Sequence, residues 1–235
     1  MSYKESLFFI NTLILIFILI VFSHLSLSKR NNYQINISFA NNKSNFLSDS
    51  LVNKLLIQKI IKPCKQKNLK LDLNKIELFL ESLPEVQNAE VFSYVDGNLY
   101  AVIYENIAIL RVQQEEFYLD FFGNKIPFST NYTPKVPIFS GPFGDKKTLE
   151  LVHLSKFITR DNYLKNEFVE IWNEKYGFTI RLRNYNFEIF WGKSNNNKKK
   201  INKLKAFCAY LSENKIDKKL KRIDLTVNNQ IVSTY

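Results

Sequence analysis

The chain has 235 residues, a formal net charge of +11, 46% hydrophobic residues and 23% charged residues. That length suits one or two modest domains with an apolar core, and the composition excludes collagen-like, low-complexity and wholly disordered chains. The chain has only two cysteines and two histidines, which excludes a disulfide-dense scaffold and a Cys₄ zinc site. We therefore expect no metal and no cofactor.

The longest apolar run lies near the N-terminus. From Leu7 to Phe22 it is interrupted only by Asn11 and Thr12, and its extension to Leu27 gives 21 residues without a charge. At about 1.5 Å per residue this run spans roughly 31 Å, close to the thickness of a bilayer's hydrocarbon core. The run predicts one transmembrane helix over 7–27 after a cytoplasmic tail over 1–6. The side chains expected to face lipid are Leu7, Ile10, Leu13, Ile16, Phe17, Ile20 and Phe22.

A cleaved signal peptide is the alternative for this segment. Signal peptides have an apolar region of about 7–15 residues followed by a small-x-small cleavage site. The run here is longer, and Ser26-Leu27-Ser28 is a weak match, so we favour the uncleaved anchor. The flanking charges do not decide its orientation, because Lys4 on one side stands against Lys29 and Arg30 on the other.

Strand signals frame the next part of the chain. Ile35, Ile37 and Phe39 alternate with polar residues and predict a half-buried strand over 33–39. Two further strands, over 86–94 and 99–105, flank an Asp-Gly-Asn turn that is typical of a tight hairpin.

Two helices are predicted between these strands. Ser48 caps the first, which has Leu51, Leu55 and Ile60 on one face and ends at Ile61, before Pro63. The second begins near Asn74, which resembles a capping box with Glu77, and ends at Pro84. Its expected buried residues are Ile76, Phe79, Leu80 and Leu83. The core expected for this unit is Ile37, Leu55, Ile76, Leu80, Val91 and Ile103.

The remainder of the chain predicts an α+β domain of mixed or antiparallel strands with two helices. The helices are expected over 147–158 and 198–213. On the strand over 178–183, Thr179, Arg181 and Arg183 are expected on a solvated face. The expected strands cover 109–112, 116–120, 125–128, 168–172, 178–183, 187–191, 222–227 and 230–233.

No pattern along the chain predicts catalysis. His153 has no catalytic partner nearby in the sequence, and no glycine-rich phosphate loop follows a strand. Lysines outnumber arginines by 27 to 6, whereas proteins that read nucleic-acid bases rely on arginine. We expect no enzyme, no nucleic-acid partner and no small-molecule substrate, and the sequence leaves open whether Cys64 pairs with Cys208.

Several short runs match one protein family in their order and spacing. They are Leu73-Asn74-Lys75-Ile76-Glu77, Leu83 to Val91, Asp96 to Leu99, Tyr104-Glu105, Phe117 to Asp120 with Gly123 and Pro127, Val136 to Gly141, and Ile223-Asp224-Leu225 with Asn229 to Val232. On these runs the chain resembles the FtsQ/DivIB family of bacterial cell-division proteins over nearly its whole length. The resemblance implies a POTRA domain over 28–105 and an FtsQ-type β domain over 106–235. The chain departs from the family pattern at Asn106, Ala108, Thr226 and Val227.

The resemblance also implies a role. It implies a non-catalytic scaffold of the divisome in the inner membrane at the septum, with a cytoplasmic N-terminus and a periplasmic C-terminal region. Its implied partners are the lipid bilayer and an FtsB/FtsL pair, which adds a strand to the C-terminal sheet edge. The partner-binding residues expected from this are Ile223, Asp224, Leu225, Thr226, Val227, Gln230, Ile231 and Val232.

Two other functions remain open from the sequence. One is a POTRA-bearing component of outer-membrane assembly or secretion, although the residues after 105 are too few for the usual long barrel. The other is a membrane-tethered extracytoplasmic enzyme, which a cluster of titratable groups in a deep pocket would support.

Overall fold

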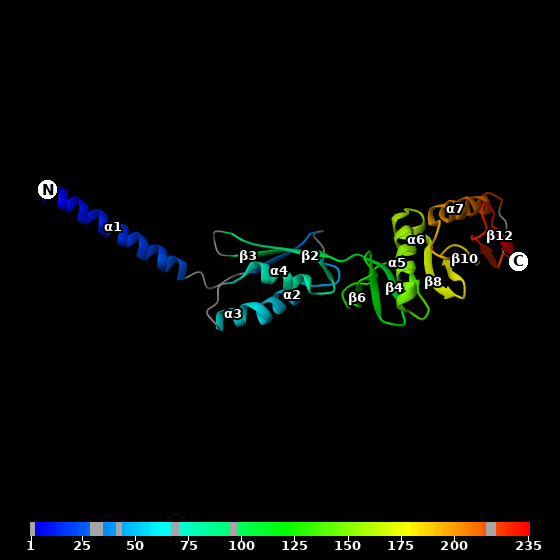
Figure 1. Cartoon of the computed structure of the whole chain (residues 1–235), viewed down its shortest axis with the longest axis horizontal. Helices are drawn as coiled ribbons and strands as arrows, with labels where there is room; N and C mark the ends of the chain where they lie inside the picture. The colour runs from blue at the N-terminus through cyan, green and yellow to red at the C-terminus, as the bar shows by residue number, and fades with distance from the viewer. Residues whose placement is uncertain (1–2, 29–34, 41–43, 67–70, 95–97, 215–219) are drawn as a thin grey trace.

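The computed structural model describes residues 3–28, 35–40, 44–66, 71–94, 98–214 and 220–235, and omits the side chains of 3–9, 24–28, 65–66, 145–146 and 214. The fold is mixed α+β, with a three-stranded sheet followed along the chain by a nine-stranded sheet (Figure 1). We call the residues around these sheets the first and the second unit. The predicted Asp96-Gly97 turn lies outside the described residues.

The first helix, α1 (Tyr3–Ser28), contains the predicted membrane segment. The side chain of Leu7 lies outside the description. The other six side chains that we expected to face lipid are all exposed: Ile10, Leu13, Ile16, Phe17, Ile20 and Phe22. Within the described part of the chain, no helix is both long enough and apolar enough to cross a membrane.

The first unit has the predicted order of strand, helix, helix, strand and strand. Its sheet runs β1 (Ile35–Phe39), β3 (Leu99–Glu105) and β2 (Val86–Ser93), with β1 parallel and β2 antiparallel to the central β3. The apolar side chains of the helices and of one sheet face form its core. The buried members are Phe39, Leu47, Val52, Leu56, Ile76, Leu80, Val86, Ala89, Val91, Leu99, Ala101 and Ile103.

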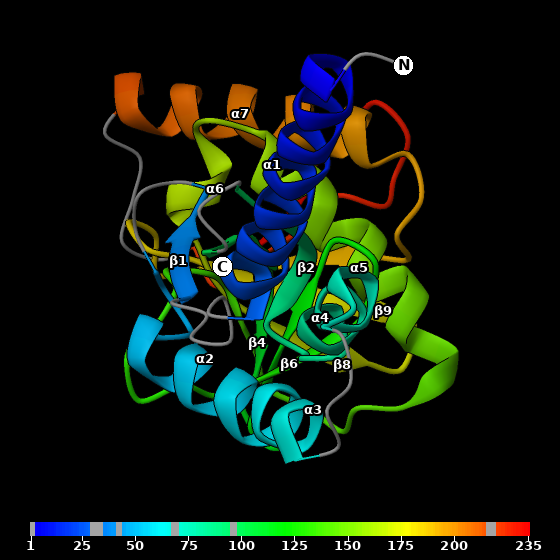
Figure 2. The same ribbon diagram turned by 90° about the vertical axis from the view of Figure 1, so that its left-hand side faces the viewer.

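Ser48 caps the first helix of this unit as predicted, but Pro63 does not stop it. The hydroxyl Oγ of Ser48 accepts from the backbone N–H of Leu51 at 3.3 Å. The helical run continues from α2 (Asp49–Leu56) through a π turn over Ile57–Ile61 into α3 (Lys62–Gln66), as Figure 2 shows. A proline clashes with the carbonyl of residue i−4 in a regular helix. The wider π turn just before Pro63 relieves that clash.

The predicted face of this helix is wrong. Its buried residues are Val52, Leu56 and Ile61, whereas Leu51 is exposed and Leu55 and Ile60 are half-buried. In the regular helix α2 the buried pair Val52 and Leu56 keeps the expected spacing of four, one position after the predicted pair Leu51 and Leu55. The π turn explains only the last member, because the fifth residue in that turn puts Ile61, and not Ile60, on the buried face after Leu56.

The second helix, α4 (Leu73–Glu81), buries Ile76 and Leu80 as predicted. Its capping box is wrong, because Asn74 lies inside the helix and Asp72 holds the cap position. Glu77 instead accepts from the backbone N–H of Val91 at 2.8 Å, and Glu81 accepts from that of Ala89 at 3.4 Å. Both donors belong to the edge strand β2, so α4 covers that edge of the sheet.

In the second unit, the sheet order is β12-β11-β10-β9-β8-β7-β4-β5-β6. The pairs β10–β11, β4–β7 and β7–β8 are parallel and the others antiparallel, so the sheet is mixed. The predicted strands are all present, whereas the two-residue β7 and the short helix α6 (Leu164–Glu167) were not predicted. The strands are β4 (Ala108–Val112), β5 (Phe117–Asp120), β6 (Lys125–Pro127), β7 (Ile138–Phe139), β8 (Phe168–Glu174), β9 (Gly177–Leu182), β10 (Glu188–Gly192), β11 (Arg222–Asp224) and β12 (Val232–Thr234).

The two long helices of this unit, α5 (Asp145–Arg160) and α7 (Asn197–Asn214), extend the predicted ranges by a few residues. Both pack apolar side chains against the sheet, among them Leu154 and Ile158 of α5 and Leu204 and Cys208 of α7. Cys208 is buried in this core and Cys64 is half-buried in the first unit, and both are free thiols.

The loop that precedes α2 in the first unit packs against the second unit. Phe46 is 4% exposed and packs with Tyr118 and Tyr132 of the second unit at ring-centroid distances of 6.0 and 5.4 Å. The next residue, Leu47, is buried in the core of the first unit. The carboxylate of Glu105 accepts from the backbone N–H groups of Asn45 and Leu47 at 2.7 and 2.8 Å. This carboxylate therefore fixes a loop whose successive side chains enter two different cores.

Candidate partner interface

The C-terminal strand β12 forms one end of the nine-stranded sheet. It pairs with β11 in the register Arg222↔Thr234 and Asp224↔Val232, and the described residues place no strand on its other side. The carbonyl of Thr234 accepts from the backbone N–H of Lys221 at 2.9 Å, so the polar backbone groups of Thr234 face β11. Because these groups alternate along a strand, those of Ser233 face the open side.

The neighbouring strand β11 lies inside the sheet. It is parallel to β10 and antiparallel to β12. Ile223 and Leu225 are 0% and 1% exposed and belong to the core. Neither side chain is accessible to a partner, and both serve to hold β11 in place.

A ladder of alternating charges crosses the other face of these strands. The sheet register sets Glu170 beside Arg181, Arg181 beside Glu188, and Glu188 beside Arg222. Opposite charges on adjacent strands attract each other, and like charges would be destabilising there. Arg181 forms an ion pair with Glu170. The ladder thus supports the pairing order of β8, β9, β10 and β11.

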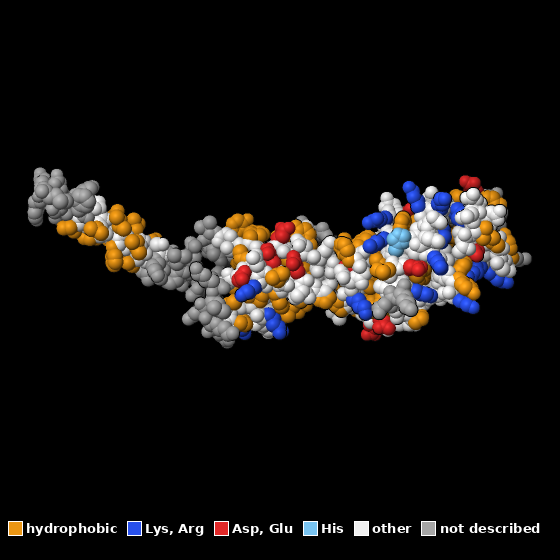
Figure 3. All heavy atoms as spheres, in the orientation of Figure 1, with side chains coloured by type: hydrophobic (Ala, Val, Ile, Leu, Met, Phe, Trp, Pro, Cys, Tyr) orange, Lys and Arg blue, Asp and Glu red, His pale blue; other side chains and the backbone are white. Residues whose placement is uncertain are grey.

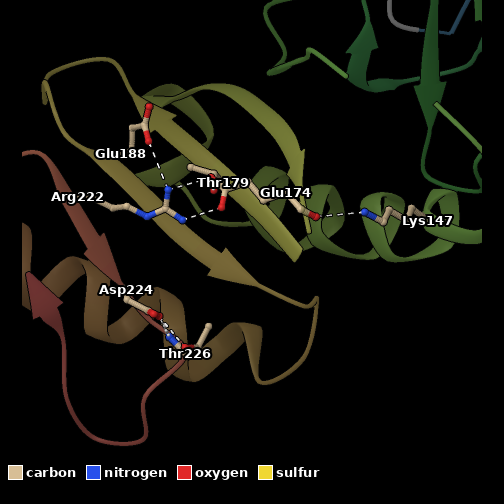
Figure 4. Close-up of polar contacts among 7 residues, drawn as sticks. All are labelled: Lys147, Glu174, Thr179, Glu188, Arg222, Asp224 and Thr226. Carbon is tan, nitrogen blue, oxygen red and sulfur yellow. Dashed lines mark hydrogen bonds and ion pairs between the residues drawn. The ribbon is translucent and has the colours of Figure 1, made fainter. Parts of the chain in front are cut away.

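Arg222 is the centre of this network (Figure 4). Its guanidinium donates to both carboxylate oxygens of Glu174, at 2.9 and 2.7 Å, and lies 3.6 Å from Glu188. The hydroxyl of Thr179 donates to the same Glu174 carboxylate at 2.6 Å. Thr179 is 0% exposed, which corrects its expected place on a solvated face. The last residue of β8 is thereby joined to the first residue of β11.

The hydrogen bonds of this pair shift both pKa values. The Arg222 guanidinium is the main cause that lowers the pKa of Glu174, and Thr179 adds to it against the opposing effect of burial. The Glu174 carboxylate in turn raises the pKa of Arg222. Both groups stay charged at neutral pH. A carboxylate with a lowered pKa contributes stability above its unfolded pKa, and that contribution is lost as the pH falls through its folded value.

The loop after β11 is held from two sides. Asp224 Oδ1 accepts from the backbone N–H and the hydroxyl of Thr226, at 2.7 and 2.6 Å. From α7, Lys203 Nζ donates to the carbonyls of Leu225, Val227 and Gln230 at 2.6, 2.8 and 3.2 Å. An ammonium has three donors, so these three carbonyls use all of them. Lys203 thereby fixes the loop that delivers the chain to β12.

Gly192 allows the same loop to approach β10. It has φ +69°, which glycine adopts readily, and a Cβ atom there would lie 2.5 Å from Thr226 Cγ2. A Cβ on Gly177, at φ +151°, would lie 2.1 Å from the carbonyl carbon of Gly192. These two glycines therefore permit the close backbone contact at this end of the sheet.

The eight expected partner-binding residues fall into three places. Ile223, Asp224 and Leu225 lie in β11 or directly after it, with the first and last of them buried. Thr226, Val227, Gln230 and Ile231 lie in the loop between β11 and β12, and Val232 alone lies in the edge strand. The predicted strands over 222–227 and 230–233 are thus shorter than expected, because Asp224 and Lys203 bind the loop between them.

A comparison with protein families decides the classification. The profile described as FtsQ/DivIB, C-terminal related matches residues 107–234. The chain belongs to this family. No curated protein matches it. The matched residues carry the whole nine-stranded sheet, and membership in the FtsQ/DivIB family points to a scaffold role in cell division.

In this member of the FtsQ/DivIB family, several residues that shape the candidate interface were not predicted from the sequence. Lys203 and Glu174 reach partners 24 and 48 positions away, at Val227 and Arg222. No local pattern signals such contacts. The Asp224–Thr226 contact has a local signal, since an Asp two residues before a Thr is typical of a turn stabilised by the carboxylate.

Proposed function

We propose that this chain is a non-catalytic scaffold of the divisome, which recruits an FtsB/FtsL-like pair by accepting a strand at β12. The family match supports the role in cell division. The open side of β12 supports the binding mode, because an unpaired row of N–H and C=O groups is a template for an added strand. Such pairing depends on backbone groups and tolerates the changes from the family pattern at Thr226 and Val227.

A proline at the open side of β12 tests the binding mode. In Ser233→Pro, the N–H that is lost faces away from β11, so the fold keeps its own hydrogen bonds. We expect the full chain to capture its co-expressed FtsB/FtsL-like pair at least about tenfold less well, a change of about 1.4 kcal/mol. Quantitative co-purification measures the effect.

Ser233→Ala is the matched control, because it removes only the side-chain hydroxyl and keeps the backbone N–H donor. It should capture the pair as well as the parent chain. Circular dichroism must show that both variants are folded. If a folded Ser233→Pro variant captured the pair at full strength, the binding site would have to lie on a surface other than β12.

We further propose that the run Leu7–Leu27 anchors the protein in the inner membrane, with its C-terminal units in the periplasm at the septum. The support is the absence of charge along this run and the exposed apolar side chains between Ile10 and Phe22. An apolar run of this length is long enough to cross the hydrocarbon core of a bilayer, and the exposure of its side chains to water is unfavourable in free energy.

A reporter enzyme that is active only in the periplasm, fused after Tyr235, tests this topology. We expect activity, and we expect the fusion to resist extraction of membranes with carbonate. A stable but inactive fusion would show that the C-terminal units face the cytoplasm. Extraction of the fusion by carbonate would exclude a membrane-spanning anchor.

A further inference from the structure

A groove lies where α7 begins and where β10 and β11 both end. Its volume is about 740 Å³, and its lining includes four lysines: Lys193, Lys199, Lys200 and Lys203. We call it the lysine groove. No aspartate or glutamate lines it. Figure 3 shows many Lys and Arg side chains over the second unit.

Two of these lysines, Lys200 and Lys203, are held by hydrogen bonds within the fold. Lys200 is 5% exposed, and its Nζ donates to the carbonyl of Lys193 at 2.8 Å and to Asn195 Oδ1 at 3.0 Å. Burial, and to a lesser extent the charge of Lys203, lowers the pKa of Lys200 to about 8. Neither contact of Lys200 is with a carboxylate. The fold therefore holds a buried positive charge without an anion in hydrogen-bond contact.

The other two lysines are available to a ligand. Lys193 and Lys199 are exposed, and neither belongs to an ion pair among the described residues. Asp224, the carboxylate close enough to raise the pKa of Lys200, is already bound to Thr226. The groove thus carries a local excess of positive charge that an incoming carboxylate would neutralise.

The position of the groove indicates what could deliver such a carboxylate. Thr226, Asn228 and Asn229 form its wall, and they belong to the loop that leads directly into β12. A segment paired along the open side of β12 passes this loop once it extends beyond Val232. Residues that flank the added strand therefore come close to the lysines.

We propose that the lysine groove binds the carboxylates of an acidic peptide segment that flanks the strand added at β12. The identity of that segment as part of the partner rests on the proposed function. The binding of acidic peptide by the groove does not, and it can be measured without the partner.

The experiment uses the full chain in detergent and a fluorescent hexaglutamate peptide, with hexaglutamine as the neutral probe. We expect hexaglutamate alone to bind, with an affinity that falls as salt is added. Lys199→Gln should weaken binding about fivefold, because an exposed ion pair contributes up to about 1 kcal/mol. Lys198→Gln is the matched control, because Lys198 is an exposed neighbour on α7 that does not line the groove. It should change the affinity less than about twofold.

Three results would overturn the proposal. One is equal binding of hexaglutamate and hexaglutamine, and another is an equal effect of Lys198→Gln and Lys199→Gln. The third is binding of tripolyphosphate, with the same dependence on Lys199, while hexaglutamate does not bind, which would make the groove a phosphate site. The Ser233→Pro variant separates this proposal from strand addition, since it should lose the partner and still bind hexaglutamate.

Discussion

Phe46→Ala is expected to lower the free energy of unfolding by about 3–5 kcal/mol, as for other buried phenylalanines. Phe46 is 4% exposed and packs against Tyr118, Tyr132 and Ile126 of the second unit. Its backbone carbonyl also accepts from the hydroxyl of Ser129 at 2.9 Å. Because Phe46 comes from the loop before α2, its ring is a contact between the first and the second unit. Denaturant titration of the full chain in detergent measures the loss.

The same substitution should loosen the two units relative to each other. Spin labels at positions 78 and 149, whose leucines are 66% and 77% exposed, report their separation in a Cys64→Ser background. Phe46→Ala should broaden the distance distribution. Leu47→Ala is the control, because Leu47 is buried in the first unit alone and its loss should destabilise the chain while the distribution stays narrow. An unchanged distribution in Phe46→Ala would show that other contacts fix the units.

The order of elements could be predicted because most helices and strands carry a clear apolar period. The strand pattern of Ile35, Ile37 and Phe39 and the pair Ile76 and Leu80 both correspond to buried faces. The failures have local physical causes. A π turn before Pro63 is not encoded in a 3.6-residue period, and a two-residue strand such as β7 is too short to show any period.

The interface was harder to predict than the fold. A sequence indicates that its last strands exist, but the outer position of β12 depends on which strand each neighbour joins. The same holds for charge. Lys203 and Lys199 are four residues apart in one lysine-rich stretch of α7, yet Lys203 binds three carbonyls and Lys199 lines a groove. The two roles differ because the carbonyls that Lys203 binds belong to the loop between β11 and β12, whose position depends on the fold.

Leu80→Ala should be nearly as destabilising as Phe46→Ala, with a loss of about 2–5 kcal/mol. Leu80 is 0% exposed on α4 and packs in the core of the first unit. Its helix also supplies Glu77, which accepts from Val91 of the edge strand β2 at 2.8 Å. A cavity beneath α4 should therefore weaken the cover of that edge as well as the core. Hydrogen exchange at the Val91 amide, beside denaturant titration, measures both effects.

Leu78→Ala provides the matched control on the same helix. Leu78 is 66% exposed, so its truncation removes the same atoms from solvent instead of from the core and should change stability by no more than about 0.5 kcal/mol. Faster exchange at Val91 in Leu80→Ala, but not in Leu78→Ala, is the expected pair of results. Equal stability of the two variants would mean that this face of α4 is not buried in solution. Slow exchange at Val91 in both variants would show that the hydrogen bond from Val91 to Glu77 does not depend on the packing of Leu80.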